Sequence, residues 1–168
     1  EKIYVKMTMR DQARAPSGLF PGTGIALTLR RVSTNLLSGL IEAVAAPPYN
    51  GRADLPPLAA GLQHEIDDLF PVAETLQLLR FAELAGGDIQ LTQAGRRFAE
   101  SGVDDRKRIF VQQLQAYVPL AAHIHRILSE RPTRMAPARR FRDELEDHMS
   151  EADAAETLRA VTNWARYA

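Results

Sequence analysis

The chain of 168 residues contains no cysteine. This absence excludes disulfide bonds and zinc sites built on thiolates, and it removes the nucleophile of cysteine-dependent enzymes. No apolar run approaches the ~20 residues that a membrane-spanning helix needs, and no basic-then-apolar signal sequence opens the chain. We therefore expect the protein to lie in the cytoplasm. Because the first residue is Glu rather than Met, we also expect the chain to be a piece of a longer protein.

Motifs for nucleotide binding and catalysis are also missing. The sequence has no GxxxxGK[ST] loop, no GxGxxG after a strand and no HExxH. The glycines of residues 18–24 are not followed by Lys-Ser or Lys-Thr, so they suit a linker better than a phosphate cradle. No serine has a His and Asp partner in a known motif. We expect no catalytic residues, no cofactor and no metal site in this chain, and hence no enzyme activity of its own.

The histidines do not form a metal-binding pattern. His123 and His125 are two positions apart, which on a helix separates their side chains by roughly 200°. They therefore cannot easily share a metal ion. His64 and His148 are far from this pair in the sequence, and we expect all four to lie at the surface or at helix ends.

Charge is balanced over the whole chain but not along it. Residues 1–33 carry a net charge of +4, residues 34–100 carry −5 and residues 101–168 carry +1. A strongly acidic central segment repels nucleic acid and suits a basic protein surface.

Hydrophobic periodicity predicts helices over most of the chain. Residues 34–46 have apolar side chains at three- and four-residue spacing from Leu36 to Val44, with Ser33 or Thr34 as the cap and Pro47-Pro48 as the stop. Residues 102–168 are predicted to be helical, with Trp164 in the core or at an interface. Residues 26–29 are predicted as a short strand.

The order of the elements expected in residues 54–100 predicts a winged helix. A short helix (58–62), a turn (63–67) and a second helix (68–80) are followed by a hairpin whose turn is Gly86-Gly87, since glycine accepts the positive φ of such turns. The expected fold is mainly α with a small β-hairpin wing. A winged-helix-like domain of residues 34–101 would precede a helical domain of residues 102–168. A second, truncated winged helix is the alternative for the helical domain.

The second helix of this pattern is acidic. In DNA-binding winged helices this helix contacts bases, and affinity comes mainly from neutralising phosphates. Here the helix and the turn before it contain no Lys or Arg ahead of Arg80. They carry four carboxylates, and these form the candidate interaction surface: Glu65, Asp67, Asp68 and Glu74. The alternative, a DNA-binding transcriptional regulator, would use the basic residues after the wing as nucleic-acid contacts: Arg96, Arg97 and Arg106.

Several phrases of the sequence match a family pattern. They are LLSGLIEA (36–43), PPYNGRADL (47–55), DDLFPVAE (67–74), TQAGR (92–96), VPLAAHI (118–124) and DELEDH (143–148). Over about residues 33–168 the chain resembles the AAA-associated C-terminal domain. That domain follows the ATP-binding subunit of nitrate/sulfonate/bicarbonate-type ABC importers.

The resemblance implies an accessory, regulatory domain for protein interaction, with no catalysis in this fragment. Residues 1–33 would be the end of the ATPase domain and a linker, and residues 1–9 look like the last helix of that domain. The implied partners are the ATPase domain and the membrane subunits of an importer, with a second copy of the chain as a further candidate and nucleic acid disfavoured. The implied location is the cytoplasmic side of the inner membrane, as a peripheral part of the transporter.

Overall fold

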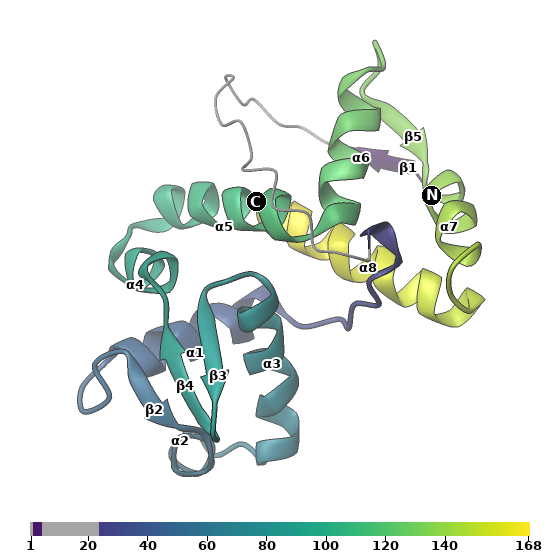
Figure 1. Cartoon of the computed structure of the whole chain (residues 1–168). Helices are drawn as coiled ribbons and strands as arrows, with labels where there is room; N and C mark the ends of the chain where they lie inside the picture. The colour runs from purple at the N-terminus through teal and green to yellow at the C-terminus, as the bar shows by residue number, and fades with distance from the viewer. Residues whose placement is uncertain (1, 5–23) are drawn as a thin grey trace. The chain divides into compact units, whose positions relative to one another are not determined.

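The computed structural model describes residues 2–4 and 24–168 (Figure 1). Within them the chain forms eight α-helices, one short 3₁₀ helix and two small antiparallel sheets. The expectation of a mainly helical fold with a small β component is confirmed. Across these described residues, no helix is both long enough and apolar enough to cross a bilayer.

The chain divides into two compact units. We call residues 32–113 with 167–168 the sheet unit, and residues 2–4, 24–31 and 114–166 the helical unit. The domain boundaries predicted at residues 33 and 101 stay predictions.

The sheet unit begins with α1 (Thr34–Ala45). Ser33 caps this helix, since its side chain accepts a hydrogen bond of 3.2 Å from the Asn35 N–H. The predicted apolar stripe is buried from Leu37 to Val44, but its first residue, Leu36, is 44% exposed. The helix ends directly before the Pro47-Pro48 pair, as predicted.

Two further helices and a three-stranded sheet follow. The elements are β2 (Arg52–Asp54), α2 (Leu55–Gly61), α3 (Ile66–Leu78), β3 (Ala82–Ala85) and β4 (Asp88–Leu91). The sheet is antiparallel with the order β2-β4-β3, and Gly86 and Gly87 form the hairpin turn with φ of 60° and 90°. The hairpin prediction is thus confirmed, whereas β2 was not predicted. A three-residue strand is too short to show an alternating pattern.

Helix α3 starts two residues earlier than the sequence indicated. The predicted helix began at residue 68, but Glu65 takes the N-cap position and Asp67 and Asp68 both lie in the first turn. Carboxylates are favourable there because they face the positive end of the helix dipole. The helix ends before Arg80, whose φ of 59° is incompatible with a continuing right-handed helix.

An aromatic cluster closes the core of the sheet unit. The Phe81 ring lies 5.4 Å from that of Phe98 in α4 (Gln93–Glu100) and 6.0 Å from that of Phe110 in α5 (Val103–Tyr117). Helix α4 approaches the Phe81 backbone closely, because a Cβ at Gly95 would lie 2.1 Å from the Phe81 carbonyl oxygen. Position 95 therefore requires glycine for packing.

The helical unit contains three α-helices that lie wholly or almost wholly within it, one 3₁₀ helix and a two-stranded sheet. The elements are β1 (Lys2–Tyr4), the 3₁₀ helix η1 (Gly24–Ala26), α6 (Pro119–Ser129), β5 (Met135–Pro137), α7 (Ala138–Glu146) and α8 (Glu151–Tyr167). Strand β1 pairs antiparallel with β5, placing Ile3 opposite Ala136 (Figure 1). The helix expected for residues 1–9 is therefore wrong at 2–4, and the rest of it lies outside the described residues.

The strand predicted for residues 26–29 is also wrong. The 3₁₀ helix covers Gly24–Ala26, and the residues that follow have no strand partner. Instead, the Leu29 N–H donates a 3.1 Å hydrogen bond to the Thr157 Oγ1 of α8, and both residues are buried. A side chain thus satisfies the backbone donor that a neighbouring strand would otherwise satisfy. On the same helix α8, Trp164 is buried, so it belongs to the core.

Replacing Gly95 with alanine should destabilise the sheet unit. The added methyl group has no space against the Phe81 carbonyl, so we expect the free energy of unfolding to fall by about 1–3 kcal/mol. Gly39→Ala is the matched control, because that site is exposed, helical and has nothing within 4 Å of the new Cβ. It should instead stabilise by about 0.5–1 kcal/mol. Urea unfolding measures both; equal effects of the two substitutions would contradict the packing argument.

Replacing Thr157 with valine tests the buried hydrogen bond of the helical unit. The substitution keeps the side-chain shape but leaves the Leu29 N–H without an acceptor, which should cost about 1–3 kcal/mol. Thr162→Val in the same helix is the control, because the Thr162 hydroxyl only donates to the Leu158 carbonyl one turn earlier. Thermal unfolding should show a clearly lower Tm for Thr157→Val alone.

Candidate interaction surface

Helix α3 has one buried side and one outward face. Its buried side, built from Leu69, Val72, Ala73 and Leu76, packs against α1, α2 and β3. The exposed positions Ile66, Phe70 and Glu74 are four residues apart, so they follow one another along the opposite side of the helix. The residues that pack α3 into the sheet unit therefore also fix which side chains it presents outward.

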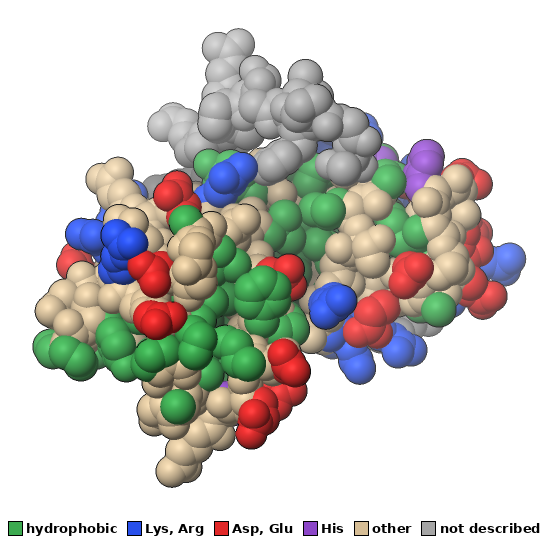
Figure 2. Space-filling model, turned by 60° about the horizontal axis from the view of Figure 1, so that its bottom comes forward, with side chains coloured by type: hydrophobic (Ala, Val, Ile, Leu, Met, Phe, Trp, Pro, Cys, Tyr) green, Lys and Arg blue, Asp and Glu red, His purple; other side chains and the backbone are tan. Residues whose placement is uncertain are grey.

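The outward face is lined by carboxylates. All four residues predicted from the sequence are exposed: Glu65, Asp67, Asp68 and Glu74. Within the described part of the chain, none of their side chains forms a hydrogen bond or an ion pair. Figure 2 shows acidic side chains gathered beside exposed hydrophobic ones on the face that it brings forward. The four predicted residues thus lie on α3 and its N-cap, and none is neutralised by another described side chain. Asp67 and Glu74 share the side of Phe70, whereas Glu65 and Asp68 lie around the first turn of the helix.

Acidic residues on α7 are arranged differently. There Arg139, Arg140 and Arg142 lie four residues before Asp143, Glu144 and Glu146, with N···O distances of 3.4–3.5 Å. The acidic side of α7 is thus neutralised by ion pairs within the same helix. An acidic run alone therefore does not mark a binding surface, since α7 neutralises its own charge and α3 does not.

Helix stability accounts for only part of the acidity of α3. Asp67 and Asp68 lie in the first turn, where each carboxylate contributes roughly 0.3–1 kcal/mol through the helix dipole. Glu74 lies two turns further along, where this effect has faded. The helix dipole therefore does not account for the charge of Glu74, and its carboxylate has no partner among the described residues.

Exposed hydrophobic side chains accompany these carboxylates, and the sequence reasoning missed them. Leu62 and Ile66 are each 37% exposed and Phe70 is 45% exposed. The sequence could have predicted their exposure. Ile66 and Phe70 are four residues apart and lie outside the buried stripe of α3, so both fall on its outward face. The outward face of α3 therefore combines the apolar side chains of Ile66 and Phe70 with the negative charges of Asp67 and Glu74.

The three arginines of the DNA-binding alternative do not form one surface. Arg106 is held inside the sheet unit: its guanidinium donates to the carbonyls of Phe98, Ala99 and Ser101 at 2.9–3.0 Å and also pairs with Glu42. It thereby satisfies carbonyls at the end of α4 that would otherwise lack donors. Arg96 and Arg97 are exposed on α4.

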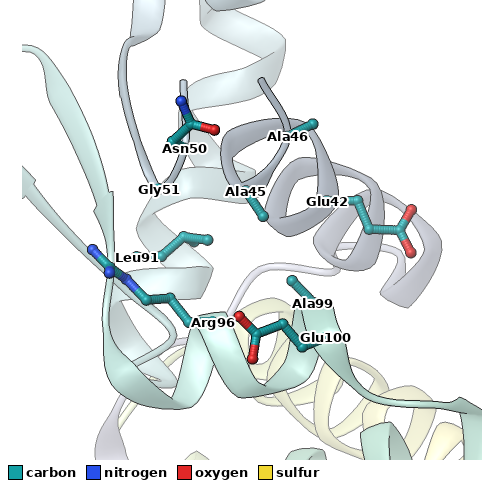
Figure 3. A pocket seen from close by; sticks show the side chains of 9 residues that line it. All are labelled: Glu42, Ala45, Ala46, Asn50, Gly51, Leu91, Arg96, Ala99 and Glu100. Atoms are coloured by element: carbon teal, nitrogen blue, oxygen red, sulfur yellow. The ribbon is translucent and has the colours of Figure 1, made fainter. Parts of the chain in front are cut away.

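A pocket of about 370 Å³ lies between α1, the turn after it and α4 (Figure 3). Its apolar residues are Ala45, Ala46, Leu91 and Ala99, and its polar residues are Glu42, Asn50, Arg96 and Glu100. The Arg96 guanidinium lies against Gly51, 3.3 Å from the position of a Cβ there. The volume is within the range of small-ligand sites, but charges of both signs line the pocket and no convergent set of donors selects one ligand.

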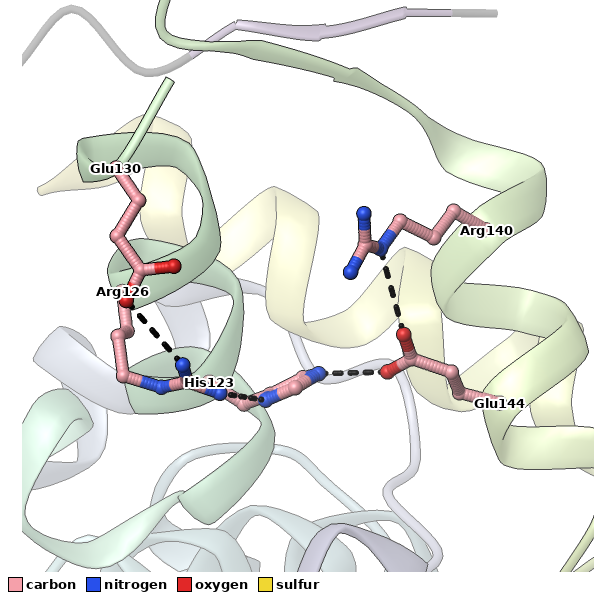
Figure 4. A network of polar contacts seen from close by, with 5 residues as sticks. All are labelled: His123, Arg126, Glu130, Arg140 and Glu144. Atoms are coloured by element: carbon pink, nitrogen blue, oxygen red, sulfur yellow. Dashed lines mark hydrogen bonds and ion pairs between the residues drawn. The ribbon is translucent and has the colours of Figure 1, made fainter.

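His123 takes part in a polar network of the helical unit (Figure 4). Its Nε2 lies 2.6 Å from Glu144 Oε2, and its Nδ1 lies 3.3 Å from Arg126 Nη2. Because a guanidinium can only donate, Nδ1 accepts and the Nε2–H donates to Glu144. The histidine thus bridges α6 and α7. Among the described residues, no three His, Asp or Glu side chains are grouped to hold a metal ion.

The role of Arg106 can be tested by its effect on stability. Arg106→Met removes charge-assisted hydrogen bonds to three carbonyls, so the free energy of unfolding should fall by about 1.5–3 kcal/mol. Arg97→Met, at an exposed position of α4, should change it by less than about 0.5 kcal/mol. Urea unfolding measures both values; a stable Arg106→Met variant would return this side chain to the set of free surface cations.

The comparisons with known proteins agree with the resemblance in the sequence. A family model described as the C-terminal AAA-associated domain matches residues 56–168, more than half of the chain. Searches of curated proteins and of solved structures found no significant match. The matched range contains α2, α3 and all the helices after them. The chain therefore belongs to the family of C-terminal AAA-associated domains.

Proposed function

We propose that this chain is a regulatory protein-interaction domain of an ABC importer of the nitrate/sulfonate/bicarbonate type, at the C-terminus of its ATP-binding subunit. The family implies an accessory domain of ABC-type ATPases. The observation that carries the interaction role is the group of carboxylates on α3 that have no ion-pair or hydrogen-bond partner among the described residues. Such exposed charge is available to a partner from outside.

The arrangement of the sheet unit supports a winged-helix scaffold. The order α1-β2-α2-α3-β3-β4, with strands arranged β2-β4-β3, provides two helices joined by a turn and then a hairpin. In such a scaffold α3 occupies the position of the helix that contacts DNA. The scaffold thus presents α3 to a partner, and the side chains on α3 select which partner it is.

Electrostatics disfavours DNA as that partner. Phosphate neutralisation supplies most of the affinity for DNA, and residues 66–78 contain no Lys or Arg. The carboxylates at 67, 68 and 74 would each repel a phosphate backbone. Arg106 is already bound to backbone carbonyls, so only Arg96 and Arg97 remain from the alternative set. A polypeptide surface with positive charge is the better match.

The proposed partners are the ATPase domain and the membrane subunits of the importer. Residues 1–33 would be the end of the ATPase domain and its linker, so ATP hydrolysis would occur outside this domain. The domain would need no cofactor, and it would lie on the cytoplasmic side of the inner membrane as a peripheral part of the transporter.

Reversing charge on α3 should change transporter regulation. In the ATP-binding subunit that carries this domain, assembled with its membrane subunits, Asp67→Lys combined with Asp68→Lys should change the ATPase rate or the oligomer mass. The reason is that both substitutions replace attraction to a basic partner with repulsion. ATPase assays and light scattering provide the two measurements.

The control is Asp104→Lys combined with Asp105→Lys. These residues also lie in the first turn of a helix, α5, so the control includes a comparable loss of helix-dipole stabilisation. It should leave both measurements at the wild-type values. Unchanged ATPase rate and unchanged mass in the α3 variant would refute the proposal, as would tight and specific duplex binding by the chain at physiological ionic strength.

A further inference from the structure

We propose that the outward face of α3 binds an amphipathic helix of another polypeptide, one with apolar side chains flanked by Lys or Arg, and that Phe70 is the central anchor. This inference rests on the proposed function in that it takes α3 as the interaction surface. It adds the binding residues and the chemistry of the partner.

Phe70 lies at the centre of the exposed face. With about 100° per residue, Ile66 and Glu74 each lie about 40° from Phe70, on opposite sides of it. Phe70 is 45% exposed although it is the largest apolar side chain of α3. Large aromatic side chains surrounded by polar groups are typical of the residues that dominate binding energy at protein interfaces. Ile66, which is 37% exposed, extends the apolar area one turn before it.

The charges around Phe70 determine the class of partner. Asp67 and Glu74 lie within about 60° of Phe70 around the helix, and Glu65 and Asp68 add negative charge at the start of α3. None of the four carboxylates has a side-chain partner among the described residues. Anionic lipid and nucleic acid would be repelled. In a symmetric contact through this face a second copy of the chain would set like charges against each other. A basic polypeptide is the class of partner that gains from both the apolar and the acidic groups.

The shape of the surface favours a helix over an extended strand. The row from Ile66 to Glu74 spans nine residues and rises about 12 Å along the helix axis, which matches about two turns of a partner helix. Ridges of one helix pack into the grooves of another at this scale. A strand could instead be added at the edge of β3, but there the Leu84 N–H already donates a 2.8 Å hydrogen bond to the Gln77 side chain of α3. Strand addition would have to break this contact.

The test uses the whole chain and two labelled helical peptides of 15 residues. Both carry leucine at four- and three-residue spacing, and one has Lys at the flanking positions where the other has Glu. We expect the Lys peptide to bind with a Kd of about 1–100 μM, since an interface of two helical turns is small. The Glu peptide should not bind in this range. Fluorescence anisotropy at low and at physiological salt measures both.

Matched variants separate the two parts of the surface. Phe70→Ser should weaken binding of the Lys peptide about tenfold or more, whereas Leu36→Ser, which removes a side chain of similar exposure from α1, should not change it. Asp67→Asn with Glu74→Gln should weaken binding several-fold and flatten its salt dependence. Asp104→Asn is the control for the loss of a first-turn carboxylate. Ile66→Ser provides a second apolar variant, and circular dichroism establishes that each variant is folded.

The outcomes distinguish this inference from the proposed function. Equal binding of the Lys and Glu peptides, or undiminished binding after both Phe70→Ser and Ile66→Ser, would overturn it. If the charge-reversed α3 variant changes transporter ATPase while neither peptide binds, the regulatory role stands and the helical partner is wrong. Selective binding of the Lys peptide, lost on Phe70→Ser, supports the inference whatever the ATPase assay gives.

Discussion

The sheet unit depends on the backbone of Phe81, where the end of α3, the hairpin and α4 meet. The Phe81 N–H donates to the Leu76 carbonyl at 2.9 Å, and its own carbonyl accepts from the Thr92 N–H at 3.0 Å. Gly95 approaches the same carbonyl so closely that no side chain fits. The Thr92 hydroxyl adds a 2.6 Å hydrogen bond to the Arg80 carbonyl. These contacts fix the C-terminal end of α3 and thereby the side chains that the helix presents outward. A surface ordered in this way would lower the entropic cost of the binding proposed for α3.

Local sequence determines whether acidic residues on a helix are neutralised. On α7 each of three arginines precedes a carboxylate by four residues, and the pairs form. On α3 the residues four positions after Asp67, Asp68 and Glu74 are Pro71, Val72 and Leu78. None of them can pair with a carboxylate. The negative charge of α3 therefore persists on the surface of the folded unit, and this difference carries the proposal that α3 is the site of contact.

Several elements were predictable because their signals are local. Gly86-Gly87 predicted the hairpin, since two adjacent residues with positive φ strongly favour glycine. Ser33 and the proline pair at 47–48 predicted both ends of α1. Strands β1 and β2 were missed because each has three residues and is defined by its pairing with a distant segment, and residues 2–4 had resembled the end of a helix instead.

The sequence by itself determined the helical character of the chain, the hairpin and the acidity of α3, because helix periodicity, glycine turns and the absence of nearby cations are all properties of neighbouring residues. Only the tertiary structure decided which side chains remain free. It placed Arg106, which had been a candidate for DNA contact, against the carbonyls of α4, and it left Phe70 outside the core. Burial and hydrogen bonding depend on residues far apart in the chain, and composition and spacing alone do not specify which of them meet.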